Sequence, residues 1–277
     1  KLLTREGFEF ELFISEYKDH IKEVVSKFDK SILDKFDSII VVGGDGTMSE
    51  VFSGLAISGI FDLPVGIIPM GTGNDLARSL NIPLNYPVFA SRIIKLKKMK
   101  TIDMCRINSD YFVNYVGFGL DGQVMSYKKF QKSLLPKRLS FIKPIIQALK
   151  QLKTYKYYLK IDGHEEVLEG INLIVTNIPT YSAGIRLYPE AEINDKIFEI
   201  TFLRKLPSAG NIALLPVMHS KLLRKDKDFI QFQASELEIS FSDSVPFIQV
   251  DGDHYETNSG DFKLKFISES INVFCNV

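Results

Sequence analysis

The chain has 277 residues, of which 34 are Lys or Arg and 34 are Asp or Glu, so its formal net charge is zero. Hydrophobic residues make up 45% and charged residues 25%, which excludes an intrinsically disordered chain, because such chains have few apolar residues and a large net charge. A uniformly basic protein that binds nucleic acid is disfavoured as well, since its excess charge would appear in the total. We therefore expect a folded protein with no nucleic-acid partner.

Two cysteines, Cys105 and Cys275, are too few for a disulfide framework, so we expect reduced, buried thiols in a cytoplasmic protein. No run of about 18 apolar residues occurs, which predicts no membrane-spanning helix. A signal-peptide pattern is absent as well. The chain begins at Lys1 rather than Met, so we expect residues upstream of it.

Strands and helices alternate up to about residue 100, which predicts an α/β layer architecture. Two of the strands are short, apolar and β-branched, as is typical of strands buried on both faces of a parallel sheet. In chain order the predicted elements are a strand at Phe8–Phe13, a helix at Ser15–Phe28, a strand at Phe36–Val42, a helix at Met48–Ser58, a strand at Pro64–Ile68, and helices at Leu76–Leu80 and Pro87–Lys97.

From residue 100 onward strands predominate and turn signals separate them, which predicts an antiparallel β-sandwich or curled sheet. The predicted strands are Lys100–Asn108, Tyr111–Tyr115, Tyr155–Ile161, Glu165–Asn177, Ile197–Leu203, Gln231–Phe241 and Phe247–Val250, with helices at Gly119–Lys153 and Pro207–Leu223. We therefore predict two domains, residues 1–102 and 103–269, followed by a last strand at residues 270–277.

A glycine-rich loop, residues 43–47 with the sequence Gly-Gly-Asp-Gly-Thr, joins a buried strand to a helix. Its glycines permit close backbone approach, and free N–H groups at a helix N-terminus favour phosphate. Asp45 would repel that phosphate unless it holds Mg²⁺ or accepts a proton from an attacking hydroxyl. The alternative is a tight turn in which Asp45 only caps the helix.

A second strand-to-helix loop, Gly71-Thr72-Gly73-Asn74-Asp75, offers a hydroxyl and another carboxylate. Asn74 is suited to capping the following helix, and Asp75 could be no more than a helix-start charge. Neither loop has the Walker A pattern or the dinucleotide-binding fingerprint. Because both loops follow neighbouring strands, we expect them to meet in one crevice at the carboxyl ends of the sheet.

These two segments carry a resemblance to a known family. Residues 42–51 resemble the Gly-Gly-Asp-Gly-Thr nucleotide loop of the diacylglycerol kinase catalytic-domain superfamily, a loop that NAD kinases share. Residues 69–80 resemble that superfamily's second signature, which is more specific to lipid kinases. The order of elements matches through nearly the whole chain and is most similar to soluble bacterial diacylglycerol or lipid kinases.

The resemblance implies an α/β nucleotide-binding domain of the NAD kinase and diacylglycerol kinase type, a C-terminal β-sandwich domain, and an active site between them. It also implies that residues 270–277 return towards the first domain. The family's first strand, with its Asn-Pro-x-(Ser/Ala)-Gly motif, is absent from this sequence, so we expect it to be missing from the start of the chain.

The resemblance further implies which residues bind the nucleotide. Ser15 takes the place of a nucleotide-contacting Thr, although it could simply cap a helix. Asp75 and Asp103 match acidic positions near the cleft. The residues predicted to bind nucleotide are Ser15, Gly43, Gly44, Asp45, Gly46, Thr47, Met48, Ser49, Glu50, Gly71, Thr72 and Asn74.

The loop at residues 192–197 resembles a structural Mg²⁺ loop of the family. The Asp195 side chain and the backbone carbonyls of Glu192 and Ile197 would be the ligands, and oxygen donors suit a hard cation. Lys196 stands where the family usually has Gly, and the alternative is an ordinary Asn-Asp turn.

Asp253 falls where the family has the Glu of an Asp-Gly-Glu motif, which is the assigned proton acceptor. The Asp side chain has the same chemistry but is one methylene shorter, and it could also be a plain turn residue. The sequence leaves open whether Asp253 or Asp45 is the catalytic base.

Charge is unevenly distributed, since no acidic residue lies between Asp121 and Asp162. This basic stretch, in which apolar residues are interleaved, fits docking on an anionic membrane surface, or else a solvated helix face that covers the β-domain. Its ten positive residues are Lys128, Lys129, Lys132, Lys137, Arg138, Lys143, Lys150, Lys153, Lys156 and Lys160.

Together these features predict an ATP-dependent lipid kinase that uses Mg²⁺ and acts peripherally at the inner membrane surface. Diacylglycerol, giving phosphatidic acid, is the expected substrate, and a homodimer is compatible with the resemblance. Two alternatives stay open. One is an NAD kinase-like enzyme; the other is a regulator that binds nucleotide or lipid and has lost turnover, which the departures at Asp253 and Lys196 allow.

Overall fold

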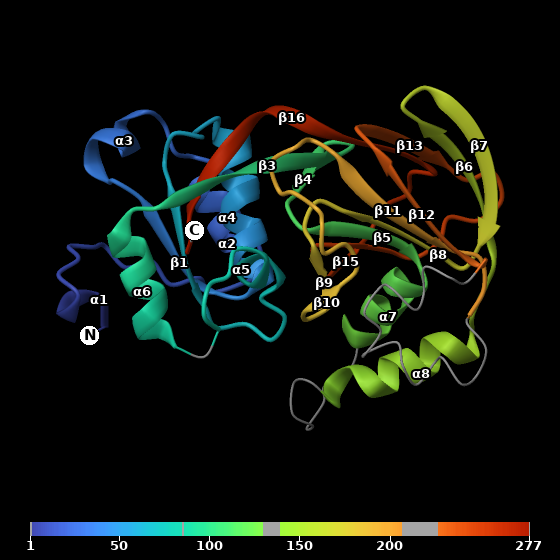
Figure 1. Ribbon diagram of the computed structural model, residues 1–277, viewed down its shortest axis with the longest axis horizontal. Helices are drawn as coiled ribbons and strands as arrows, with labels where there is room; N and C mark the ends of the chain where they lie inside the picture. The colour runs from blue at the N-terminus through green and yellow to red at the C-terminus, as the bar shows by residue number, and fades with distance from the viewer. Residues whose placement is uncertain (1, 85, 130–138, 207–226, 277) are drawn as a thin grey trace.

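The computed structural model describes residues 2–84, 86–129, 139–206 and 227–276. An α/β part and a β-sandwich part lie side by side along the long axis of the molecule (Figure 1). The fold class predicted from the sequence, α/β followed by a β-sandwich, is confirmed.

In the α/β part, strands β1 (Ile39–Gly43) and β2 (Val65–Pro69) pair in parallel, and helix α4 (Asp45–Ser58) connects them. Both strands end directly before a glycine loop. Closely packed glycines bring helices onto this core, since a methyl group on Gly54 would lie 2.6 Å from Val25 Cβ. The remaining helices here are α1 (Leu2–Arg5), α2 (His20–Val25), α3 (Ser31–Lys35), α5 (Asp75–Ser79) and α6 (Pro87–Leu96).

One sheet runs through both parts, in the order β1-β2-β16-β13-β6-β7. Strand β16 (Asp261–Phe274) makes this possible, because its first residues pair with β13 (Glu236–Ser240) and Val273 pairs in parallel with Val65 of β2. Strand β3 (Met99–Ile107) pairs with β16, and β4 (Asp110–Phe112) pairs with β3. The last strand therefore connects the β-sandwich part to the α/β part through the hydrogen bonds of one sheet.

A second sheet, with six strands among the described residues, closes the sandwich over a core rich in phenylalanine, including Phe112, Phe118, Phe198 and Phe202. Helices α7 (Leu120–Lys129) and α8 (Ile142–Lys150) lie beneath this sheet in Figure 1, and η1 (Leu139–Phe141) precedes α8. The sheet order is β12 (Phe229–Ala234), β11 (Phe198–Leu203), β8 (Asn172–Thr176), β5 (Tyr115–Gly119), β14 (Ile248–Val250) and β15 (Asp253–Tyr255). Strands β9 (Thr180–Tyr181) and β10 (Ile185–Arg186) form a small separate hairpin. Strands β6 (Tyr155–Ile161) and β7 (His164–Gly170) form the far end of the first sheet.

The predicted strand at Phe8–Phe13 is wrong, because the structure has irregular backbone there and Phe10 and Phe13 are exposed. Alternation of apolar and polar residues needs a neighbouring strand to become a ladder, and among the described residues β1 pairs only with β2. The helix predicted over Ser15–Phe28 is likewise reduced to α2.

Two predicted strands each prove to be two. Residues 165–177 divide at Ile171 into β7 and β8, and residues 231–241 divide at Ser235 into β12 and β13. In each case the two strands lie in different sheets. A continuous apolar pattern does not reveal where the chain passes from one sheet to the other. The predicted helix Pro207–Leu223 and the middle of the predicted helix Gly119–Lys153 lie outside the described residues.

Candidate active site

The two glycine loops are in direct backbone contact. A methyl group on Gly44 would lie 2.8 Å from Gly71 Cα, and one on Gly71 would lie 2.4 Å from Gly44 Cα. The Met70 N–H donates to the Gly43 carbonyl at 2.7 Å. The loops therefore meet at the carboxyl ends of β1 and β2, where open α/β sheets bind ligands.

Asp45 links the two loops. Its carboxylate accepts the N–H groups of Asn74 at 2.6 Å and Asp75 at 2.7 Å, so it caps α5 although it is itself the first residue of α4. Burial raises the pKa of Asp45, and the N–H donors act in the opposite direction. The helix-capping alternative is thus partly realised, but the helix that Asp45 caps belongs to the other loop.

Asn74 closes the second loop on itself. Its side-chain oxygen accepts the Gly71 N–H at 2.9 Å, and its amide group donates to the Gly71 carbonyl at 3.0 Å. The backbone of Asn74 is left-handed, with φ of 52°, a conformation that Asn tolerates better than most residues. This leaves Thr72 at the turn of a fixed loop.

Asp75 joins the two parts of the molecule. Its carboxylate, only 1% exposed, accepts the N–H groups of Ala183 at 3.0 Å and Gly184 at 2.8 Å. The Tyr115 hydroxyl donates to the same carboxylate at 3.4 Å. Burial raises the pKa of Asp75 to about 6, and the nearby charge of Asp45 adds to the rise. Asp75 is therefore a contact between the domains as well as a helix-start charge.

Other predicted nucleotide residues have structural partners. Glu50 accepts the N–H groups of Asp19 and Ile21 at 3.1 Å each and so caps α2. The Met48 side chain is buried in the α/β core, and Ser15 lies exposed in the irregular segment before α2. Gly46, Thr47 and Ser49 lie in the first turns of α4.

Asp103 anchors the predicted metal loop to β3. Its carboxylate accepts the Lys196 N–H at 2.8 Å and the Ser270 hydroxyl at 3.0 Å. Within the loop, the Asp195 carboxylate accepts the Ile197 N–H at 3.0 Å, and Glu192 pairs with Lys100.

The carboxylates of this loop do not form a metal site by themselves. Among the residues that the structure describes, no group of three or more His, Cys, Asp or Glu side chains could hold a metal ion. Lys196, with a left-handed φ of 56°, extends its ammonium group to the Ser268 carbonyl at 3.0 Å. The assignment of Glu192, Asp195 and Ile197 as Mg²⁺ ligands stays a prediction.

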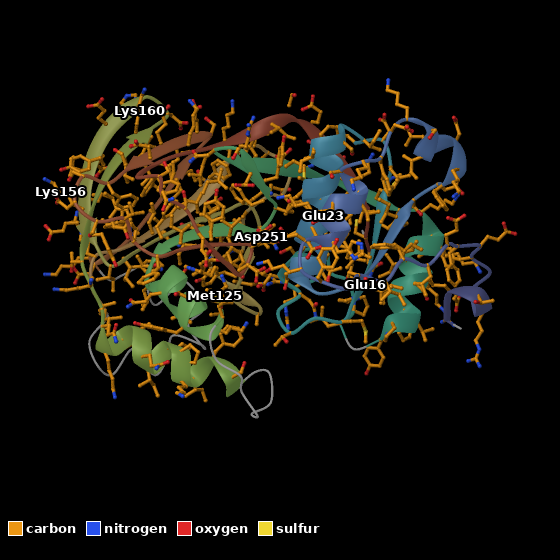
Figure 2. All side chains as sticks on the ribbon, turned by 180° about the vertical axis from the view of Figure 1, so that it is seen from behind. Glu16, Glu23, Met125, Lys156, Lys160 and Asp251 are labelled. Carbon is orange, nitrogen blue, oxygen red and sulfur yellow. The ribbon has the colours of Figure 1, made fainter. Side chains whose placement is uncertain are left out.

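The two aspartates of the Val250–Asp253 motif have different surroundings. Asp251 is buried and accepts three backbone N–H groups, those of residues 113, 114 and 115, and burial raises its pKa to about 6. Figure 2 shows Asp251 at the junction of the two parts. The Asp253 side chain is 61% exposed, and it lies 3.0 Å from Lys18 Nζ of the α/β part. Asp251 therefore builds the turn, and Asp253 is the carboxylate open to solvent.

Sequence reasoning missed three polar residues that connect to Asp75, namely Tyr115, Asp121 and Tyr181. The Tyr181 hydroxyl donates to the Asp121 carboxylate, and the ring of Tyr181 packs edge-on against Tyr115. One sequence signal could have revealed Asp121, since it follows the apolar strand β5 and Gly119 much as Asp45 follows β1 and its glycines.

Two family models cover most of the chain. The family described as "Diacylglycerol kinase catalytic domain" matches residues 1–107, and the family described as "YegS C-terminal NAD kinase beta sandwich-like domain" matches residues 114–273. The chain belongs to the diacylglycerol kinase family. The resemblance noted for residues 42–51 and 69–80 is thereby confirmed, and the chain is a kinase.

Diacylglycerol kinases and an NAD kinase are among the proteins that are similar to this chain. A diacylglycerol kinase of Bacillus subtilis (strain 168) is 26% identical over 270 residues, which cover 89% of this chain and 88% of the relative. The crystal structure of a diacylglycerol kinase from Bacillus anthracis strain Sterne is 22% identical, covers 95% of this chain and 83% of that chain, and has a TM-score of 0.69. An NAD kinase from Archaeoglobus fulgidus in complex with ATP is 16% identical, covers 99% of this chain and 87% of that chain, and has a TM-score of 0.54. The two solved structures show the fold alone.

Proposed function

We propose that the chain is an ATP-dependent lipid kinase that transfers the γ-phosphoryl group to the hydroxyl of diacylglycerol and so forms phosphatidic acid. The observation that carries the proposal is the backbone contact between the loops at Gly44 and Gly71, with Asp45 bridging them. Two glycine loops at a helix N-terminus offer N–H groups and a positive dipole to phosphates. The membership of the diacylglycerol kinase family supports the choice of lipid.

The chemistry of the cleft suits Mg²⁺ that arrives with ATP. Proteins usually hold Mg²⁺ through one or two carboxylates together with substrate phosphates, so a site of three protein carboxylates is not required. Each oxygen of Asp45 accepts one of the two N–H groups from α5, and a carboxylate oxygen has room for a further partner. We therefore propose Asp45 and Asp75 as the carboxylates that would hold Mg²⁺, which neutralises phosphate charge when it is bound.

Asp253 is the residue that we propose as proton acceptor. In the reaction the lipid hydroxyl oxygen bonds to the γ-phosphorus, the bond to the ADP oxygen breaks, and the hydroxyl proton passes to a carboxylate. Asp45 is half-buried and engaged with two N–H groups, whereas Asp253 is exposed at the start of β15. Exposure favours Asp253 because a lipid hydroxyl has to reach the base.

The decisive experiment uses the purified chain, ³²P-labelled ATP and Mg²⁺ with a panel of acceptors. Diacylglycerol, monoacylglycerol and ceramide are each presented in mixed micelles, and NAD is presented in a parallel reaction. We expect label in the lipid extract with diacylglycerol. Labelled NADP would support the NAD kinase alternative instead, and ATP binding without transfer to any acceptor would support the regulator.

The raised pKa of Asp75 predicts a pH dependence. Its carboxyl group, with a pKa of about 6, is protonated below pH 6 and ionised above it, and only the ionised form can bind a cation. We expect kcat/KM for ATP to rise between pH 5 and pH 7 with a midpoint near 6, and we expect this rise to be absent in Asp75→Asn. The residual activity of Asp75→Asn is measured over the same pH range. If kcat/KM of the variant rises with pH as that of the wild type does, another group is responsible for the titration.

Helix α8 is the surface that we propose for membrane docking. Ile142, Ile145 and Ile146 are 42–50% exposed on it, while Pro144 and Ala148 face the protein. Lysines flank these apolar side chains, and no acidic residue occurs between Asp121 and Asp162. Within the described ranges, no helix is both long and apolar enough to cross a bilayer. An apolar face with basic flanks fits peripheral contact with anionic lipid.

A double substitution, Lys143→Gln with Lys150→Gln, tests this surface. Each basic residue near an anionic membrane contributes about 1 kcal/mol, so the pair should weaken binding to phosphatidylglycerol-containing vesicles roughly 20- to 30-fold. Vesicle co-sedimentation at low salt measures the effect. Lys30→Gln, the loss of one charge at an exposed position before α3, is a control for charge loss elsewhere on the surface and should bind as the wild type does.

A further inference from the structure

The orientation of Asp75 is decided by the other part of the molecule. Both of its carboxylate oxygens accept N–H groups from the turn between β9 and β10, and its backbone carbonyl accepts the Thr180 hydroxyl at 2.7 Å. The Ser79 hydroxyl also contacts Thr180 at 2.7 Å. Figure 1 shows the β9–β10 hairpin between α5 and α7. A shift of this turn would therefore move the Asp75 side chain.

The turn does not adopt its conformation through local preference. Ser182, Ala183 and Gly184 have φ values of 47°, 67° and 105°, so three successive residues lie in the left-handed region. Residues with a side chain persist there only when surrounding contacts hold them. Gly184 also packs tightly, because a methyl group there would lie 3.0 Å from the Arg78 guanidinium. Contacts with neighbouring residues therefore have to hold the turn in this conformation.

Tyr181, the residue directly before the turn, provides that support. Its hydroxyl donates to the Asp121 carboxylate, and its ring lies 4.9 Å from the Tyr115 ring in an edge-on contact. Tyr115 in turn donates to Asp75. The turn is thus held on one side by Asp121 and contacts Asp75 on the other.

Asp121 is itself fixed and shielded. It lies in the first turn of α7, and its N–H donates to the Asn172 side chain at 3.1 Å. A methyl group on Gly117 would lie 2.6 Å from its carboxylate oxygen, so β5 passes directly against it. Burial raises the pKa of Asp121 to about 6, because removing the charged carboxylate from water costs free energy. No step of the proposed reaction uses this group.

We propose that Asp121 and Tyr181 are positioning residues that hold the β9–β10 turn against the Asp75 carboxylate and so set the geometry of the cleft. The inference rests on the proposed role of Asp75 at the phosphates. Tyr181 acts through the turn and touches no reacting atom. Its effect must therefore depend on the carboxylate of Asp75.

A mutant cycle tests this dependence. Tyr181→Phe keeps the ring but loses the hydrogen bond, and we expect kcat/KM for ATP to fall about tenfold, since small displacements in a cleft have effects of this size. In an Asp75→Asn background the same change should alter kcat/KM by less than twofold. Asp121→Asn keeps an oxygen that accepts from Tyr181, so it should stay within threefold of the wild type. Each variant is checked by thermal unfolding.

Tyr157→Phe is the matched control, because Tyr157 is a buried tyrosine whose hydroxyl donates to the Phe118 carbonyl inside the β-sandwich. It should lower the unfolding midpoint and leave KM for ATP unchanged. The proposal is overturned if Tyr181→Phe lowers kcat/KM for ATP equally in the wild-type and the Asp75→Asn backgrounds. It is also overturned if Tyr181→Phe, like Tyr157→Phe, lowers the unfolding midpoint and leaves KM for ATP unchanged. A loss in Asp121→Asn as large as that in Tyr181→Phe would likewise overturn it.

Calorimetric titration with ATP in the absence of lipid separates this inference from the proposed function. If ATP affinity shows the same dependence on Asp75 but no lipid is phosphorylated, the positioning role stands and the lipid kinase proposal fails. If lipid is phosphorylated and the effects of Tyr181→Phe and Asp75→Asn are additive, the positioning role fails and the lipid kinase proposal stands. Absence of ATP binding by the wild-type chain overturns both.

Discussion

Asp45→Asn should lower kcat for phosphoryl transfer about 10²- to 10³-fold, as the loss of one electrostatic contact in a reaction cleft typically does. The Asp45 carboxylate lies between the two glycine loops and accepts the N–H groups of Asn74 and Asp75. An asparagine amide would direct N–H groups at one of those donors, so the α5 cap is weakened too. We expect a loss of about 1 kcal/mol in the free energy of unfolding.

The stability effect and the catalytic effect of Asp45→Asn can be separated. Asp162 is a suitable control because its carboxylate also accepts two backbone N–H groups, those of Ser235 at 3.0 Å and Glu236 at 2.9 Å, in a turn of the β-sandwich. Both groups donate to the same oxygen, Oδ1, which asparagine would keep, so the control is Asp162→Ala. It should cost at least similar stability and leave kcat unchanged. Both variants are compared by denaturant unfolding and by transfer of label from ATP. Near-wild-type activity of Asp45→Asn would remove Asp45 from the phosphate site.

Asp253→Asn should reduce kcat about 10²- to 10⁴-fold if its carboxylate takes the lipid hydroxyl proton, because this is the usual contribution of a general base. Stability should hardly change, since the ion pair with Lys18 is exposed and such pairs are worth about 0–1 kcal/mol. Asp253→Glu keeps the carboxylate and should retain activity. The assay is again transfer of label to diacylglycerol.

Glu256→Gln is the matched control for Asp253→Asn. Glu256 is an exposed carboxylate three residues further on, and it pairs with Lys129 at 2.6 Å. Its replacement removes a comparable surface ion pair without touching the proposed base, and activity should be unchanged. Full activity of Asp253→Asn would transfer the role of base to Asp45, the other carboxylate that the sequence left open.

Local features of the chain were predictable because their causes are local. The apolar runs before residues 43 and 71 are rich in β-branched residues, and a glycine loop follows each of them, so strand, loop and helix N-terminus could all be assigned from neighbouring residues. Burial on both faces holds for β2 but not for β1, where Val42 is exposed. The same reasoning failed at Phe8–Phe13, where the alternation was present but no strand was available to pair with it. A strand exists only together with its partner.

The candidate active site likewise combines residues that the sequence predicts with partners that it does not. Sequence reasoning selected Asp45 and Asp75 from their motifs, but it could not supply the partners Ala183 and Gly184, which lie more than 100 positions further along the chain. It also passed over Asp251, whose three N–H donors come from residues 113–115. The contact between Asp121 and Tyr181 could not be predicted for the same reason, since the two residues lie 60 positions apart in the chain.

By itself the sequence determined that this is a folded α/β and β-sandwich chain of the diacylglycerol kinase type, with two glycine loops that meet at the ends of parallel strands. Composition, periodicity and short motifs suffice for that, because each depends on residues a few positions apart. Only the tertiary structure decided that β16 joins both parts in one sheet, that Asp253 and not Asp251 is exposed, and that a turn of the β-sandwich orients Asp75. These depend on strand pairing and on buried hydrogen bonds between distant segments, whose partners are chosen when the chain folds.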